Sequence, residues 1–290
     1  MIRVYETPVG ETVELGRVST DAETVERYWR THGLSPADGR RTLPLGLALA
    51  LRGGPLPAVE LDPRAVSFHA GHTLNAQRSF VAGRTYGVRA RIAEVFEKSG
   101  RSGPLTVVAR TAELYDADAV VVAIDEQQIV RWRAPDAAEP PTHEPFSHGD
   151  ELPQETTEDL DIGSTIAALR RRAPGAQEIH GYAGSLGGSE PFFSDPSSAR
   201  RLGFADVIVP GPMQSALFED LLARRLPTWD LVDLSLSFRV SVVVGEPIAL
   251  RAIVIELSAE HDHLVADLTL ENRSGDRAAV GTATLVASRA

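Results

Sequence analysis

Two histidines, His69 and His72, are the residues in the first half of the chain best suited to proton transfer. Imidazole changes its charge near neutral pH, so a histidine beside a substrate can act as a general acid or base. Both stand where the first half turns into its predicted sheet, and from there they could face a groove between the two halves of the chain. The alternative is that they pack in the core or lie at the surface.

Gly211 and Tyr182 are candidates for holding a ligand. Gly211 opens a predicted helix, and a helix N-terminus presents oriented N–H groups. Pro212 removes one of those donors, so a purely structural reason for the Gly-Pro pair stays open. Tyr182 lies on another predicted helix, at the start of an apolar pattern, and is equally explained as a core residue. Asp195 before Pro196 fits a helix N-cap.

The composition argues against several other kinds of chemistry. The chain has no cysteine, which excludes disulfides and thiolate nucleophiles, and its net charge of −11 argues against nucleic acid or an anionic membrane as a partner. Neither metal-ligand spacing nor a nucleotide-binding glycine loop is present, so we predict no metal and no cofactor. The longest apolar stretch, Leu43–Leu51, is too short to span a bilayer. The N-terminal residues lack the features of an export signal, and we expect a cytoplasmic protein.

An internal repeat indicates how these residues are positioned. Arg89 matches Arg251 and Glu94 matches Glu256 at one constant offset (251 − 89 = 162 and 256 − 94 = 162). A Pro-rich, acidic stretch over residues 134–163 separates the two matching segments and is predicted to be a linker. We therefore predict an N-terminal unit over residues 1–133 and a C-terminal unit over residues 164–290.

Each unit is predicted to contain helices followed by a meander of strands. In the first unit a helix begins with Thr20 and Glu23 as a capping box, and an all-apolar helix follows over residues 43–54. In the second unit helices are expected over residues 164–172, after Asp195 and from Gly211. Alternating or β-branched runs predict the strands, over residues 86–95, 105–115, 119–131, 231–243, 248–257, 263–271 and 278–287. The expected fold class is α+β, with each antiparallel sheet wrapped around one central helix.

In these features the chain resembles the double hot-dog proteins related to MaoC-type (R)-specific enoyl-CoA hydratases and 3-hydroxyacyl thioester dehydratases. The similarity rests on the run from His69 to Gly83, the hairpin from Glu97, the segment YAGSLGGSEPFFSDPSSARRLGF from Tyr182, and VIVPGPM from Val207. It implies two hot-dog repeats and an acyl chain on coenzyme A or a carrier protein as the ligand. Related single-repeat proteins dimerise, and a homodimer of this chain stays possible.

The same resemblance locates a departure at the residues that would do the chemistry. The family pattern implies an Asp and a His that activate water, whereas this chain has Gly188 and Phe193 at those positions and Glu190 at an Asn position. Gly211 keeps the place of the glycine whose N–H holds the thioester oxygen. Ordinary Asp/His hydration is therefore not expected, because positioned acid–base groups are worth roughly 10²–10⁴ in rate.

Two hypotheses follow from this departure. The first is an enzyme of the hydratase/dehydratase lineage, a lyase by descent, that uses a rebuilt site on an acyl or polyketide thioester, or that has become a cyclase or isomerase. The second is a non-catalytic acyl-binding protein or the partner subunit of a dehydratase. The candidate catalytic residues are Glu190, His72 and His69, and the candidate substrate-binding residues are Gly211, Tyr182, Gly188 and Phe193. Glu190 is alternatively an exposed loop carboxylate. The loop Lys98–Gly103 could meet ligand phosphates or be a solvated hairpin tip.

Overall fold

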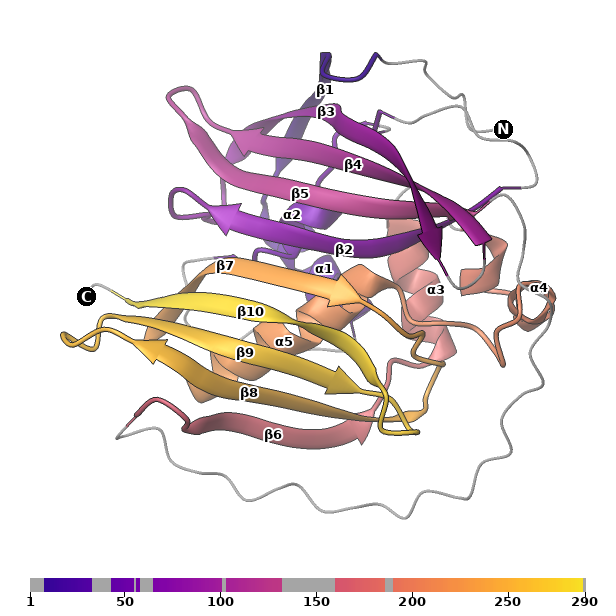
Figure 1. The fold of residues 1–290 in the computed structure, drawn as a ribbon. Helices are drawn as coiled ribbons and strands as arrows, with labels where there is room; N and C mark the ends of the chain where they lie inside the picture. The colour runs from indigo at the N-terminus through magenta and orange to yellow at the C-terminus, as the bar shows by residue number, and fades with distance from the viewer. Residues whose placement is uncertain are drawn as a thin grey trace.

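The computed structural model describes residues 8–32, 43–54, 56–57, 65–100, 103–131, 160–185 and 190–288. Most of the predicted linker and Gly188 lie outside these residues. The described chain forms one ten-stranded antiparallel sheet, in the order β1-β3-β4-β5-β2-β7-β10-β9-β8-β6 (Figure 1). Each half of the chain supplies five neighbouring strands, which is the arrangement expected of two repeats joined edge to edge.

The first half runs from β1 to β5. Its elements are β1 (Thr12–Ser19), α1 (Ala22–Thr31), α2 (Leu47–Ala50), β2 (Val66–Ala76), β3 (Thr85–Gly100), β4 (Gly103–Tyr115) and β5 (Val120–Arg131). The three predicted strands of this half correspond to β3, β4 and β5, whereas β1 and β2 were not predicted. The apolar helix predicted over residues 43–54 is a single turn, α2, and its N-cap is Gly46.

The second half repeats this plan. Its elements are β6 (Thr165–Arg172), α3 (Ala176–Ser185), the short 3₁₀ helix η2 (Pro191–Phe193), α4 (Pro196–Arg201), α5 (Gly211–Arg225), β7 (Trp229–Phe238), β8 (Pro247–Leu257), β9 (His263–Glu271) and β10 (Arg277–Ala287). Helix α5 is the central helix of this half, and in Figure 1 it lies behind the strands β7 to β9. Its residues Met213, Ala216 and Phe218 are fully buried.

Two local predictions were wrong. The segment predicted as a helix over residues 164–172 instead contains the edge strand β6, because pairing with β8 outweighs the helix propensity of an Ala-Leu-Arg sequence. The strand ends in Arg170–Arg172, and charged side chains on an edge strand oppose pairing with another chain. At α1 the N-cap is Asp21, whose carboxylate accepts the Thr24 N–H, while the Thr20 hydroxyl bonds toward the loop before β3.

The repeat itself is confirmed by the register of the strands. A β-bulge between Ile92 and Glu94 in β3 has its counterpart between Val254 and Glu256 in β8, at the predicted offset of 162 residues. At the seam between the halves, Thr73 of β2 pairs with Ser235 of β7, which again is 162 residues later (235 − 73 = 162). Their hydroxyl oxygens are 3.0 Å apart. Equivalent residues that pair with each other mark a pseudo-twofold axis through this seam.

The seam requires close contact between the two backbones. A Cβ atom on Gly71 would lie 2.6 Å from the Leu236 carbonyl oxygen, so only glycine permits this approach of β2 to β7. One continuous hydrophobic core extends across both halves and includes Leu74, Leu234 and Phe218. The site described next therefore sits in a single packed unit, beside the seam.

Candidate functional site

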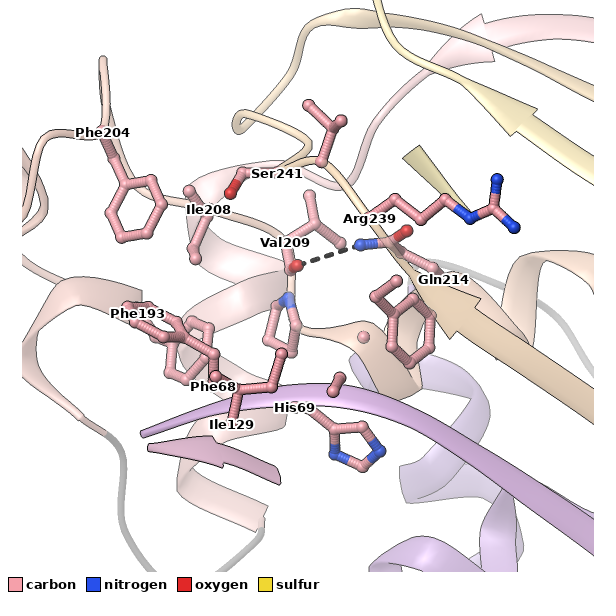
Figure 2. A pocket seen from close by; sticks show the side chains of 15 residues that line it. Phe68, His69, Ile129, Phe193, Phe204, Ile208, Val209, Gln214, Arg239 and Ser241 are labelled. Carbon is pink, nitrogen blue, oxygen red and sulfur yellow. Dashed lines mark hydrogen bonds between the residues drawn. The ribbon is translucent and has the colours of Figure 1, made fainter. Parts of the chain in front are cut away.

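A pocket of about 350 Å³ lies at the N-terminal end of α5, against strand β2 of the other half. Its apolar wall is formed by Phe68, Ile129, Phe193, Phe204, Ile208 and Phe238. Its polar side chains are His69, Gln214, Arg239 and Ser241. Figure 2 shows Phe193 and Phe204 at one end of the pocket and Gln214 and Arg239 at the other. The pocket thus has an aromatic end and a polar end.

The aromatic end is held together by ring contacts. Phe68 contacts Phe192 and Phe204 with ring centroids 5.5 Å apart in both pairs, and Phe192 packs on Phe193 at 4.4 Å. Phe192 and Phe193 are placed by η2, which is followed by α4 with Asp195 as its N-cap, as the sequence predicted. Such a wall suits an aliphatic chain, because burying each CH₂ group contributes about 0.8 kcal/mol.

The N-terminus of α5 supplies a backbone donor to this pocket. The N–H groups of Met213 and Gln214 both point to the Pro210 carbonyl, and Pro212 has none. Within the described chain the Gly211 N–H has no acceptor. The ring of Phe238 covers Gly211 so closely that a Cβ there would lie 2.6 Å from a ring carbon. Gly211 therefore keeps one N–H available in the first turn of a 15-residue helix.

His69 and His72 are brought to the same face of β2 by a β-bulge at Ala70. Three residues apart on a regular strand, they would point to opposite faces. Here His69 pairs with Gln128 and His72 with Glu126, two residues apart on β5, so both histidines share the face that looks toward α5. The bulge is what allows the His-Ala-Gly-His segment to place two imidazoles side by side.

These histidines belong to a buried chain of polar contacts. Ser215 Oγ of α5 lies 2.7 Å from His72 Nε2, and His72 Nδ1 lies 3.2 Å from His69 Nε2. His69 Nδ1 in turn lies 3.6 Å from Glu126 Oε1. We call these four residues the Ser-His-His-Glu chain. When Glu126 is ionised, one arrangement of protons fits all four residues. The Nδ1–H of His69 points to Glu126, the Nδ1–H of His72 donates to His69 Nε2, and the Ser215 hydroxyl donates to His72 Nε2.

Two arginines hold Glu126 in its charged form. Arg52 Nη2 donates to Glu126 Oε2 at 3.0 Å, and Arg110 Nη1 lies 3.6 Å from Oε1. Burial alone would raise the pKa of this carboxyl, but the charges of Arg52 and Arg110 lower it to about 2. Burial lowers the pKa of His72 to about 3 and lowers that of His69, where the charge of Glu126 opposes the effect. Both imidazoles are therefore neutral bases at neutral pH.

The sequence contained a signal for Glu126 and Arg110 that the prediction missed. Val122, Ile124 and Glu126 alternate on the buried face of β5, as do Val108 and Arg110 on β4. A charged residue in register with buried aliphatic residues indicates a paired charge inside the protein. Ser215, on the buried first turns of α5, carried no such signal.

A second buried polar cluster lies where α1, α2 and α5 meet. Glu219 of α5 accepts the Gly46 N–H at 2.6 Å, and a Cβ on Gly46 would come within 2.4 Å of the Tyr28 hydroxyl. Burial raises the pKa of Glu219 to about 8, so its carboxyl group is protonated at neutral pH. Tyr28 Oη, His32 Nε2 and Glu219 Oε2 have no hydrogen-bond partner among the described residues.

The remaining predicted site residues lie in different places. Tyr182 is fully buried, with its ring 4.9 Å from that of His32, and burial raises the pKa of its hydroxyl. Phe193 and Gly211 line the pocket together with His69. Glu190 is exposed and caps η2 without a side-chain hydrogen bond. The hairpin that includes Lys98 joins β3 to β4, and Lys98 does not line this pocket.

The described residues contain no group of His, Asp or Glu side chains that could hold a metal ion. None of the helices seen in this part of the chain is both long and apolar enough to cross a membrane.

Comparisons with known proteins agree with the geometry of the fold. A MaoC-like dehydratase superposes with a TM-score of 0.73 over 98% of this chain and 99% of its own, at 16% identity. HtdX of Mycobacterium tuberculosis gives a TM-score of 0.60 over 95% and 99% of the two chains, at 20% identity. Another Mycobacterium tuberculosis protein, described as a double hot-dog fold, gives 0.64 over 97% of both chains at 14% identity. The chain has the double hot-dog fold.

A curated relative is similar in sequence over part of the chain. A tomato (Solanum lycopersicum) protein named 3-hydroxyacyl-[acyl-carrier-protein] dehydratase FERN, mitochondrial, is 27% identical over 127 residues, which cover 43% of this chain and 76% of its own length. No protein-family model matches the chain.

Proposed function

We propose that this protein is an enzyme of the hydratase/dehydratase lineage that acts on an acyl thioester bound in the pocket at the N-terminus of α5. The observation that carries the proposal is the Ser-His-His-Glu chain, one member of which, His69, also lines the pocket. The name of the tomato relative and the fold of the MaoC-like dehydratase support the same class of substrate.

The two ends of the pocket fit the two parts of such a ligand. The aliphatic chain packs against Phe68, Phe193 and Phe204, and the thioester oxygen accepts a hydrogen bond from the Gly211 N–H. Arg239 is exposed at the polar end, where its guanidinium group suits the phosphates of coenzyme A or of a carrier-protein arm. This assigns the phosphate contact to Arg239 in place of the Lys98 hairpin.

His69 is the acid–base group in this proposal. A neutral imidazole can remove the proton beside the thioester carbonyl, and the positive charge it gains is stabilised by Glu126 at 3.6 Å. To reach the substrate, His69 Nε2 exchanges its contact with His72 for one with the ligand. His72 keeps its hydrogen bond with Ser215 through Nε2. Glu190 has no part in this scheme, because it is exposed.

The test follows the enoyl absorbance of the pure protein with a panel of enoyl and 3-hydroxyacyl thioesters. His69→Ala is expected to lower the rate by about 10²-fold or more, because positioned acid–base groups contribute that much. His180→Ala is the matched control, since His180 is an exposed histidine on α3. Equal rates for the wild type and His69→Ala would overturn the role of His69.

A second function is favoured by one specific observation. Both ring nitrogens of His69 face protein partners, and Phe193 is apolar where the related hydratases have a histidine. An acyl-binding protein, or the partner subunit of a dehydratase, needs the pocket but no free base. Tight binding of acyl thioesters without turnover of any of them would select the binding function. Failure to bind any acyl thioester would refute both.

A further inference from the structure

The pocket is built largely from phenyl rings, whereas the core around α5 is mainly aliphatic. Four of the nine phenylalanines of the chain, Phe68, Phe193, Phe204 and Phe238, line the pocket. Phe192 packs against the first three of them. The main hydrophobic core, in contrast, consists mostly of leucine, valine and alanine. Aliphatic side chains therefore exclude water in most of this protein, and the gathering of rings at the pocket needs a further reason.

The rings at the aromatic end of the pocket keep part of their surface exposed. Phe68, Phe193 and Phe204 are half-buried, whereas Phe192 behind them is only 2% exposed. Figure 2 shows Phe193 and Phe204 at the end of the pocket away from the guanidinium group of Arg239. Aromatic surface thus faces the less polar end of the cavity. A bound apolar group that covers it is stabilised, because ring surface is removed from water.

The angles between these rings favour an aromatic group over an alkyl chain. Phe68 and Phe204 meet edge to face, with their planes at 76°, and the planes of Phe192 and Phe193 are tilted by 49°. Aromatic rings attract one another in such arrangements, since the ring face is negative and the ring edge is positive. A phenyl group that enters between these rings gains ring contacts in addition to burial. An alkyl chain gains from burial alone.

We propose that the pocket selects an acyl chain that ends in an aromatic ring, a phenylalkanoyl thioester, and that Phe193 and Phe204 determine this selectivity. The aliphatic part of the chain then connects the ring to the thioester, whose oxygen accepts from the Gly211 N–H. This inference rests on the proposed function and names the chemical class of its acyl group.

The experiment compares ligands that have the same length and differ only in the aromaticity of the terminal ring. The affinities of 3-phenylpropanoyl-pantetheine and 5-phenylpentanoyl-pantetheine are measured by titration calorimetry, each beside its cyclohexyl counterpart. A cyclohexyl ring is at least as apolar as a phenyl ring, so burial alone predicts no preference for phenyl. The wild type is expected to bind the phenyl ligand of at least one length about fivefold or more tightly than its counterpart.

Leucine substitutions test the assignment to the two rings. The double variant with Phe193→Leu and Phe204→Leu keeps an apolar wall and is expected to lose the preference for phenyl. Phe96→Leu, at an exposed phenylalanine of β3 that does not line the pocket, is expected to keep it. A general loss of packing weakens both ligands of a pair alike and cancels in the ratio of their affinities. Unfolding transitions verify that the double variant is folded, and the two single variants replace it if it is not.

The remaining outcomes separate this inference from the proposed function. If the wild type shows no preference for phenyl at either length, or the double variant keeps the preference, the inference is overturned and the proposed function stands. The same holds if octanoyl-pantetheine binds and no ring-bearing ligand does. If none of these ligands binds the wild type, the proposed function itself fails.

Discussion

Glu219→Gln is predicted to make the protein more stable at neutral and mildly basic pH. The carboxyl group of Glu219 is fully enclosed and accepts the Gly46 N–H, and burial raises its pKa from 4.5 to about 8. Glutamine has almost the same shape and retains an oxygen that can accept this N–H. It removes the ability to ionise and places an NH₂ group at the position of Oε2.

The sign of the effect follows from the direction of the pKa shift. Below pH 4.5 the group is protonated in both the folded and the unfolded chain. Between about pH 4.5 and 8 the unfolded chain releases this proton first, so the wild type loses stability as the pH rises. Because one pKa unit corresponds to about 1.36 kcal/mol, the rise from 4.5 to about 8 sets an upper limit of about 5 kcal/mol on this loss.

Urea unfolding of both proteins at several pH values between 5 and 8 measures the effect. The difference in the free energy of unfolding, variant minus wild type, is expected to grow with pH by up to about 1.4 kcal/mol per pH unit. His32 and His72, whose pKa values burial lowers to about 4 and about 3, make both proteins less stable in acid and cancel in this difference. Glu260→Gln, at an exposed turn, is the control. A difference that does not change with pH would refute the assignment of a protonated Glu219.

Two further predictions concern the pocket and the charges behind it. Gly211→Ala places a Cβ 2.6 Å from the Phe238 ring, so it is expected to cost about 1–3 kcal/mol in thermal unfolding and to weaken acyl-thioester binding in calorimetry. Gly181→Ala, where the nearest atom is 4.0 Å away, is expected to do neither. Glu126→Gln removes the negative partner of the buried Arg110 and the partly buried Arg52 and is expected to cost about 3–5 kcal/mol in urea unfolding, whereas Asp125→Asn on the exposed face of the same strand costs little. Equal stability of Glu126→Gln and Asp125→Asn would contradict the ion pairing of Glu126 with Arg52 and Arg110.

Glu126 is also expected to make the stability of the protein depend on pH, with a sign opposite to that of Glu219. Its pKa is lowered to about 2, so the stability that this carboxylate contributes is present above pH 4.5 and is lost as the pH falls toward 2. The Glu126→Gln variant is therefore expected to lose less stability than the wild type between these two pH values, which urea unfolding in acid measures. An equal loss in both proteins would show that Glu126 is not held ionised by its neighbours.

Much of the fold was predictable because local patterns carry it. The offset of 162 residues between Arg89 and Arg251 identified the repeat, and the equivalent bulges of β3 and β8 confirm it. The long strands of the meander and helix α5 were predicted from alternation and from the Gly-Pro start. The segment of β6 was predicted to be a helix, because its residues favour a helix when taken alone. Pairing with the edge of β8 makes it a strand.

The sequence by itself determined which residue types are available: no cysteine, two histidines in His-Ala-Gly-His, and two adjacent phenylalanines, Phe192 and Phe193. Only the tertiary structure decided which of them meet. The bulge at Ala70 turns both histidines to one face, and the pairing of β2 with β5 and its packing on α5 bring Glu126 and Ser215 to them from residues far apart in the sequence. The reason is physical, since strand register and the seam between the halves set these contacts, and neither is encoded in the spacing of the residues along the chain.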